Sequence, residues 1–152
     1  MKNAVDLQLQ DRLRVLRHTL TETSALPEID GQLDLIVSNP PYVLTNDLRK
    51  VQSEIMLYED LRALDGGADG LDVIKSILTF AAKRLRPGGS LWLETDPTHP
   101  ELIKKHLEQY PKLGLGFVAS YKDMFKRERF VEITKVWNAS ICCSSSQLHV
   151  IY

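Results

Sequence analysis

Four consecutive residues, Asn39, Pro40, Pro41 and Tyr42, carry the most specific chemical signal in this sequence. Asn39 provides a side-chain carbonyl oxygen, and Pro40 provides a backbone carbonyl without a competing N–H, on a backbone that its ring restricts. Two such acceptors can hold both hydrogens of a planar NH₂ group, and Tyr42 offers a flat wall against which the group can lie. The pattern therefore predicts a site that grips an amide or aryl amine nitrogen.

An amide or aryl amine nitrogen is a poor nucleophile because its lone pair is delocalised. Orienting this nitrogen towards its electrophile is then the main way in which a catalyst can speed the reaction. Ideal alignment lowers the activation barrier by up to ~7–11 kcal/mol. The alternative interpretation is a simple turn with Tyr42 as a partly buried filler, since Asn-Pro is common in turns. The position of the motif favours function, because it directly follows the apolar run Leu33–Ser38 and ligands of open α/β sheets bind beyond the carboxyl ends of strands.

The elements that must position this motif alternate between strand and helix patterns. The nearly continuous apolar run Leu33–Ser38 predicts a strand buried on both faces. Residues 71–85 place apolar side chains at helical spacing, with Asp69 as the expected N-cap and Pro87 as the stop. Ser90–Glu94 then predicts the next strand.

The second half of the chain continues this alternation. Thr98 is expected to cap a helix that ends before Pro111. Leu115–Tyr121 and Arg129–Val136 predict two strands, and the charged connection between them, residues 122–128, is of hairpin type. Together these patterns predict an α/β fold with a mostly parallel sheet that ends in an antiparallel hairpin.

Three further segments give weaker signals. Arg12–Arg17 alternates charged and apolar residues, which predicts a half-buried strand. A short helical piece is expected near Asp47–Leu57, inside a loop rich in turn-forming residues. The tail, residues 138–152, has no clear period and is expected to fray.

Composition excludes several classes of protein. The 152 residues are one domain's length, since domains cluster at ~100–150 residues. A net charge of −1 is unlike a strongly basic nucleic-acid binder. The two cysteines, Cys142 and Cys143, are neighbours, so neither a disulfide framework nor a zinc site is expected, and no metal is assigned. The sequence contains no apolar run of about 18 residues and no typical targeting segment.

The segment Val37–Tyr42 resembles the signature of S-adenosylmethionine-dependent amino methyltransferases with a Rossmann-like fold. Within that group the sequence is similar to the HemK (PrmC) family, which methylates the glutamine amide in the GGQ motif of class I peptide-chain release factors. The resemblance covers about residues 3–136. Its supporting stretches are Tyr58–Asp60, Ala63–Gly67, Asp69–Leu71, Gly88–Glu94 and Arg129-Phe130, while Asp96–Leu102 resembles the animal mitochondrial branch.

The resemblance implies a role for each motif residue. Asn39 and the Pro40 carbonyl become the acceptors for the glutamine amide, and Pro41 and Tyr42 shape the pocket. The implied reaction is direct methyl transfer from the sulfonium of S-adenosylmethionine, without metal or covalent intermediate, and Asn39 also lies beside that cofactor. Glu94 is either an outer residue of the site or a solvated carboxylate at a strand end.

The resemblance also implies partners and a location. A class I release factor, through its GGQ domain, is the expected partner, and no direct contact with nucleic acid or a membrane is expected. The location is expected to be mitochondrial if the protein comes from an animal and cytoplasmic otherwise.

The same resemblance predicts that the domain is incomplete. A member of the family carries a glycine-rich loop after its first strand and an acidic residue at the end of its second strand. None of the eight glycines forms such a loop, and Gly114–Ala119, which matches G-x-G-x-x-A, follows a helix and leads into a strand. His18-Thr19 stands where the family usually has an acidic residue near adenine. Residues 1–137 are therefore expected to be the C-terminal portion of a catalytic domain, in which Leu33–Ser38 exposes an unpaired edge.

Two other functions stay open at this point. The same grip suits the NH₂ groups of adenine or guanine, as in a nucleic-acid amino methyltransferase. The basic clusters at residues 83–86 and 126–129 are more simply interpreted as solvated faces, and the net charge opposes this function. The other alternative is a catalytically inactive truncated product that does not bind the cofactor.

Overall fold

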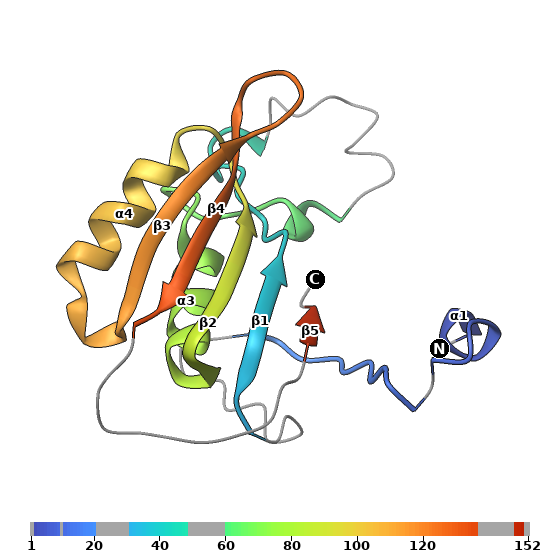
Figure 1. Ribbon diagram of the computed structural model, residues 1–152. Coiled ribbons are helices and arrows are strands. Elements are labelled where there is room, and N and C mark those ends of the chain that lie inside the picture. Colours follow the sequence, from blue (N-terminus) through green and yellow to red (C-terminus); the bar gives the residue numbers. More distant parts are fainter. Residues whose placement is uncertain (1, 10, 21–30, 49–59, 137–147, 151–152) are drawn as a thin grey trace.

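The computed structural model describes residues 2–9, 11–20, 31–48, 60–136 and 148–150. A five-stranded sheet in the order β3-β4-β2-β1-β5 forms its centre, and helices α3 and α4 lie together on one face of it (Figure 1). The helices and strands are α1 (Lys2–Asp6), β1 (Leu33–Ser38), the 3₁₀ turn η2 (Leu61–Ala63), α3 (Asp72–Arg84), β2 (Leu85–Glu94), α4 (His99–Gln109), the 3₁₀ turn η3 (Pro111–Leu113), β3 (Leu115–Lys122), β4 (Glu128–Lys135) and β5 (Leu148–Val150).

The directions of the strands confirm the predicted fold class. β1 and β2 are parallel, and α3 provides the connection between them. Ser38 pairs with Leu93, so the carboxyl ends of both strands reach the same edge of the sheet. β4 is antiparallel to both β2 and β3, which makes β3–β4 a hairpin at the end of a mixed sheet. The α/β class and the terminal hairpin follow from local periodicity alone, which is why the sequence predicts them.

The core lies between the sheet and the two helices. In β2, Leu91 and Leu93 are buried while Trp92 and Glu94 are half-exposed, as strand alternation requires. The largest fully buried side chains of the other elements are Leu33 and Ile36 from β1, Ile74, Ile77, Leu78 and Phe80 from α3, Ile103 from α4, and Val131 and Ile133 from β4.

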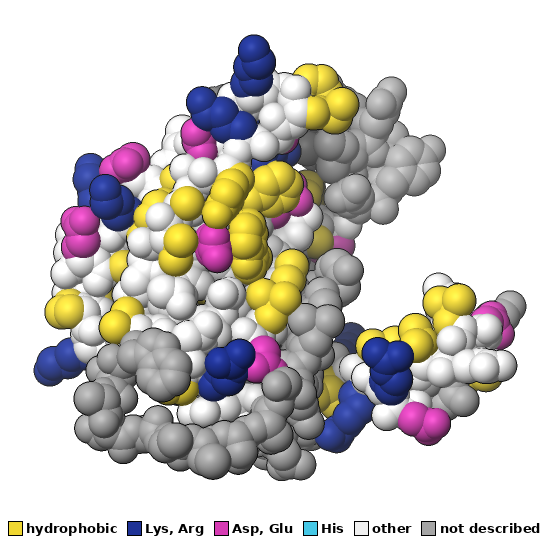
Figure 2. Space-filling model, viewed as in Figure 1, with side chains coloured by type: hydrophobic (Ala, Val, Ile, Leu, Met, Phe, Trp, Pro, Cys, Tyr) yellow, Lys and Arg dark blue, Asp and Glu magenta, His cyan; other side chains and the backbone are white. Residues whose placement is uncertain are grey.

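Aromatic side chains occupy the opposite face of the sheet. Trp92 stacks on Tyr121 with ring centroids 5.2 Å apart, and the Tyr121 hydroxyl donates a hydrogen bond of 2.7 Å to Glu132. Figure 2 shows hydrophobic side chains in the middle of this face. This stacked cluster stabilises the pairing of β2 and β4 with β3.

Both long helices begin close to the predicted residues. Asp69 accepts a hydrogen bond of 3.0 Å from the Leu71 N–H just before α3, but it does not cap the first turn of the helix itself. Thr98 occupies the predicted N-cap position of α4, but its side chain makes no capping hydrogen bond to the helix. Its backbone N–H and hydroxyl both donate to the Asp96 carboxylate, so Asp96 organises the turn that leads into the helix.

The predicted boundary at Pro87–Gly89 is wrong. α3 already ends at Arg84, and β2 begins at Leu85 rather than at Ser90, so Pro87 lies inside the strand. Leu85 pairs with Leu33 whereas Ser90 pairs with Leu35, which places an irregularity in the ladder between these pairs. Proline and glycine are tolerated in strands at such irregular positions, where the regular hydrogen bonds are interrupted.

The strand predicted at Arg12–Arg17 is also wrong. Residues 13–20 have no regular secondary structure, and Leu13, Val15 and Leu16 are exposed. An alternating pattern forms a strand only where a neighbouring strand accepts its hydrogen bonds, and none of the described strands pairs with this segment.

The prediction that β1 has an unpaired edge is also wrong. β5 pairs with β1 in parallel, with Leu35 opposite Leu148 and Val37 opposite Val150, so part of the tail is ordered into the sheet. The other tail residues, 138–147, 151 and 152, lie outside the described residues. Most of the helical piece expected at 47–57 lies outside them as well.

Within the described part of the chain, every helix is too short or too polar to cross a membrane.

Candidate active site

The predicted motif lies at the carboxyl edge of the sheet, immediately after β1. Asn39 is exposed, Pro40 is buried, and Pro41 and Tyr42 are half-buried. Because Ser38 pairs with Leu93, the residues that follow β1 and β2 emerge side by side at this edge (Figure 1). The asparagine is therefore accessible to a ligand while the first proline anchors the loop in the protein, as a gripping site requires.

The backbone after the motif is fixed by the segment that precedes α3. The Val43 N–H donates to the Leu64 carbonyl at 2.9 Å, and the Val43 carbonyl accepts from the Gly66 N–H at 2.8 Å. A Cβ at Gly66 would lie 2.8 Å from the Tyr42 Cα and 2.9 Å from the Gly70 Cα, so only glycine fits there. Three backbone segments thus meet at Tyr42 without intervening side chains.

Arg129, from β4, holds the ring of Tyr42. Its Nη1 donates to the Tyr42 hydroxyl at 3.3 Å, and its guanidinium carbon lies 5.7 Å from the ring centroid. Nη1 also donates to the Thr95 carbonyl at 3.4 Å, and Nη2 lies 3.9 Å from a Glu94 oxygen. The interpretation of the 126–129 cluster as a solvated face is therefore wrong for Arg129, whose side chain is only 24% exposed.

Glu94 is one of the partners of this arginine. It ends β2, next to Thr95, whose N–H donates to the Arg129 carbonyl at 2.9 Å. The carboxylate therefore lies beside the group that holds Tyr42. An outer role of Glu94 in the site remains a prediction.

The imidazole of His99 also lies beside the Tyr42 ring. The two rings are 6.3 Å apart, edge to face, and a Cβ at Gly70 would lie 2.7 Å from the His99 Nε2. His99 is 3% exposed, and its Nδ1 has no hydrogen-bond partner among the described residues. Burial lowers the pKa of His99 below its ordinary value of 6.5, and the carboxylates of Asp96 and Asp69 only partly oppose this shift.

We expect the protein to lose stability as the pH falls from 7.5 to 5.5, and His99 to cause part of the loss. The unfolded chain takes up a proton at His99 near pH 6.5, whereas folded His99 stays neutral to lower pH. Between the two pKa values the free energy of unfolding falls by at most about 1.4 kcal/mol per pH unit. Urea unfolding at both pH values measures the loss. The variant His99→Gln should show a shallower pH dependence, and an unchanged slope would contradict the assignment.

Sequence reasoning missed most of this support. The motif residues were identified, but Arg129, His99 and Gly66 were recognised only as parts of resembling stretches. Nothing in the sequence indicates that the glycines before α3 lie near His99, at the start of α4. These residues are far apart along the chain and come together only in the fold. The roles of Asn39 and Tyr42 towards a ligand remain predictions.

The described residues do not fit a complete site for S-adenosylmethionine. The family's donor loop is a short glycine-rich turn between a strand and a helix. Of the described glycines, Gly66 and Gly70 pack against Tyr42 and His99. Gly67 lies beside Gly66 in the same segment, where a Cβ would meet the Asp72 side chain of α3. The remaining described glycines lie at the amino end of β1, in β2, and in or next to β3. The described residues therefore contain the predicted amide-holding motif and no recognisable loop for a cofactor.

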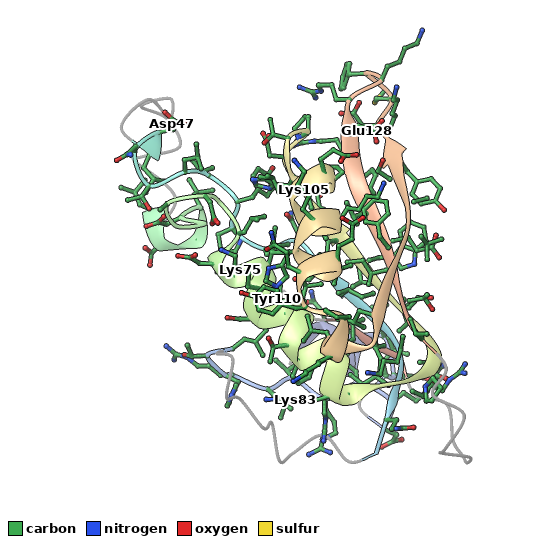
Figure 3. The ribbon with its side chains drawn as sticks, turned by 90° about the vertical axis from the view of Figure 1, so that its left-hand side faces the viewer. Asp47, Lys75, Lys83, Lys105, Tyr110 and Glu128 are labelled. Atoms are coloured by element: carbon green, nitrogen blue, oxygen red, sulfur yellow. The ribbon has the colours of Figure 1, made fainter. Side chains whose placement is uncertain are left out.

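A groove elsewhere on the described residues does not touch the motif. This groove of about 630 Å³ between α3 and α4 is lined by ten residues, and none of residues 39–42 is among them. Figure 3 shows Lys75, Lys105 and Tyr110 around this groove. No group of three or more potential metal ligands occurs in the part of the chain that the structure describes.

Comparison with curated proteins gives relatives of one kind, whereas no protein-family model matches the chain. The human protein named MTRF1L release factor glutamine methyltransferase is 43% identical over 135 residues, 88% of this chain and 40% of that protein. A release factor glutamine methyltransferase of Gloeobacter violaceus is 36% identical over 124 residues, 79% of this chain and 41% of that protein. One from Mycobacterium tuberculosis is 38% identical over 119 residues, 78% of this chain and 38% of that protein.

The chain thus spans about 40% of the length of these relatives. The similarity extends over most of the chain, and the fold is the α/β arrangement that the resemblance implies. On this shared sequence, the chain is similar to release factor glutamine methyltransferases over most of its own length and less than half of theirs.

Proposed function

We propose that the protein methylates the side-chain amide nitrogen of the GGQ glutamine in a class I peptide-chain release factor, with S-adenosylmethionine as the methyl donor. The observation that carries the proposal is the placement of an exposed Asn39 next to a buried Pro40 at the carboxyl edge of a parallel strand pair. The names of the relatives support the same reaction and substrate.

The chain's own residues would act by orientation. The Asn39 side-chain carbonyl and the Pro40 backbone carbonyl would accept the two hydrogens of the glutamine amide. Tyr42 would form the wall of the pocket, in the position that Arg129 and His99 hold. When bound, the donor supplies an electrophilic methyl group. An amide held by two acceptors presents its nitrogen in one direction, which is the effect that a weak nucleophile needs most.

We further propose that residues 1–137 correspond to the C-terminal portion of a methyltransferase catalytic domain, as the order of motifs predicts. The packing of Gly66 and Gly70 against Tyr42 supports this view, because it leaves the described residues without a donor loop. The stretch Asp96–Leu102 supports a mitochondrial location if the protein comes from an animal. Microscopy of the tagged protein tests that location.

We expect the purified 152-residue chain not to bind S-adenosylmethionine at micromolar concentrations. Two carbonyl acceptors at Asn39 and Pro40 offer too few contacts to hold a charged nucleoside without a glycine-rich loop. Isothermal titration calorimetry measures this directly, and the full-length human relative serves as the positive control. Saturable micromolar binding by the chain would contradict the proposed domain assignment.

A chimaera tests the proposed reaction whether or not the 152-residue chain binds the cofactor on its own. The 135 aligned residues of this chain replace the matching segment of the human relative, which retains its own remaining residues. The chimaera is offered an intact class I release factor, a short peptide with its GGQ glutamine, and DNA and RNA oligonucleotides. We expect mass spectrometry to find one added methyl group on the glutamine. Methylated oligonucleotide with unmodified release factor would instead establish the nucleic-acid alternative.

A further inference from the structure

The turn of the β3–β4 hairpin, residues 123–127, exposes two large apolar side chains. Met124 is 88% exposed and Phe125 is 68% exposed. The turn projects beyond the sheet at the end where β1 and β2 finish, which is the end that carries Asn39 (Figure 1). Hydrophobic and cationic side chains gather at the tip, at the top of Figure 2. Exposed large apolar groups that gather at one projecting point are a feature of interaction sites.

Hydrogen bonds to one carboxylate organise the turn. Asp123 accepts hydrogen bonds from the backbone N–H groups of Phe125, at 2.8 Å, and Arg127, at 3.0 Å. The Arg127 side chain also binds this carboxylate, with Nη2 at 3.1 Å. The hydrogen bond from the Arg127 N–H is the main reason why the pKa of Asp123 lies below its ordinary value. A turn that is ordered before binding loses little conformational entropy when a partner docks.

The turn is also connected to the candidate site. The Arg129 Nε lies 3.9 Å from the Asp123 carboxylate, while its Nη1 donates to the Tyr42 hydroxyl at 3.3 Å. One guanidinium therefore lies close to both the residue that organises the turn and the ring of Tyr42, the last residue of the motif. Figure 3 places Glu128, from the hairpin, and Asp47, from the segment after Tyr42, at the same end of the molecule. The turn has a defined position relative to the motif.

The charge of the turn indicates the chemistry of a partner. Residues 122–129 contain four cations and two carboxylates, although the whole chain has a net charge of −1. The guanidinium of Arg127 lies 5.2 Å from the centroid of the Phe125 ring, so positive charge and apolar surface occur together. Methionine, aromatic residues and arginine are the residue types enriched in protein–protein interfaces.

We propose that this turn is a docking element for the folded protein whose glutamine enters the site, through an apolar recess bordered by carboxylates on that protein. The proposal rests on the proposed function, since the partner is the release factor substrate. A glutamine side chain fills only the site at Asn39–Tyr42, so the rest of a folded substrate must lie across the carboxyl edge of the sheet. The turn projects into that space with Met124 and Phe125 at its tip.

Binding of an intact class I release factor to the 152-residue chain tests the proposal. We expect the double variant Met124→Ser, Phe125→Ser to bind the labelled release factor at least about tenfold more weakly than the original chain, because exposed aromatic anchors dominate such interfaces. Val118→Ser is the matched control, since Val118 is 50% exposed on β3 and lies outside the turn. A short peptide with the GGQ glutamine should bind both chains equally.

Several results would overturn the docking proposal. One is that the double variant binds the release factor as tightly as the original chain, and another is that the original chain does not bind it at all. A third is that the double variant loses as much affinity for the peptide as for the release factor. The last is that the turn binds an RNA oligonucleotide in preference to the release factor. The chimaera separates this proposal from the proposed function. Methylation of the release factor with turn-independent binding leaves the function and rejects the docking element. Turn-dependent binding without any methylation rejects the function and leaves the docking element.

Discussion

Replacing Asn39 with alanine lowers kcat for glutamine methylation by about 10²- to 10³-fold in the chimaera described above, if this residue orients the amide. That is the usual cost of losing one preorganised hydrogen-bonding group at a reacting centre. The Pro40 carbonyl remains, but a single acceptor leaves the NH₂ group free to rotate away from the productive direction. Asn39 is exposed, so the substitution should leave the free energy of unfolding nearly unchanged.

Two variants make this experiment specific. Asn39→Asp keeps an acceptor oxygen and should lose less activity than Asn39→Ala. Asn46→Ala is the matched control, because Asn46 is an exposed asparagine in the turn after the motif. The measurement is the initial rate of methyl transfer at saturating substrate. A kcat for Asn39→Ala within a few-fold of the parent chimaera would contradict the assigned role.

Replacing Gly66 with alanine should lower the free energy of unfolding by about 2–3 kcal/mol, the range of an overpacked core position. The new Cβ would lie 2.8 Å from the Tyr42 Cα and 2.9 Å from the Gly70 carbonyl oxygen. Both are backbone atoms, so no side-chain rotation can relieve the contact. The strain must move the backbone that carries Tyr42, and we therefore expect lower methylation activity in the chimaera as well.

Gly116→Ala is the control for this effect. Its Cβ would meet only side-chain methyl groups, of Val136 at 3.4 Å and Thr134 at 3.8 Å, which is ordinary van der Waals distance. Its effect should stay below about 1 kcal/mol. Urea unfolding followed by circular dichroism compares the two variants. Equal stability of both would show that the segment before α3 does not constrain Tyr42 in this way.

The predictions that succeeded depend on local periodicity. The strand β1, the helices α3 and α4 and the hairpin β3–β4 each follow from the pattern of apolar residues within one segment. Burial of β1 on both faces was not confirmed, because Leu35 and Val37 are only half-buried. The predictions that failed depend on neighbours in space. Arg12–Arg17 has the alternation of a strand and no strand beside it, and Leu148–Val150 pairs with β1 although its own sequence shows no period. The sequence predicts that Pro87 ends the helix, but Pro87 lies inside β2. It is tolerated there because the pairing of β1 with β2 is interrupted, and that interruption is visible only in the fold.

The candidate site divides in the same way. The sequence by itself determined the chemical groups, two carbonyl acceptors and an aromatic ring after a buried strand, because residue types and their order specify them completely. Only the tertiary structure decided what surrounds that ring. Arg129 looked like one member of a solvated basic cluster, and Gly66 like one of several turn glycines. Contacts between residues separated by many positions along the chain leave no local pattern in it, so the fold alone shows that both residues meet at Tyr42.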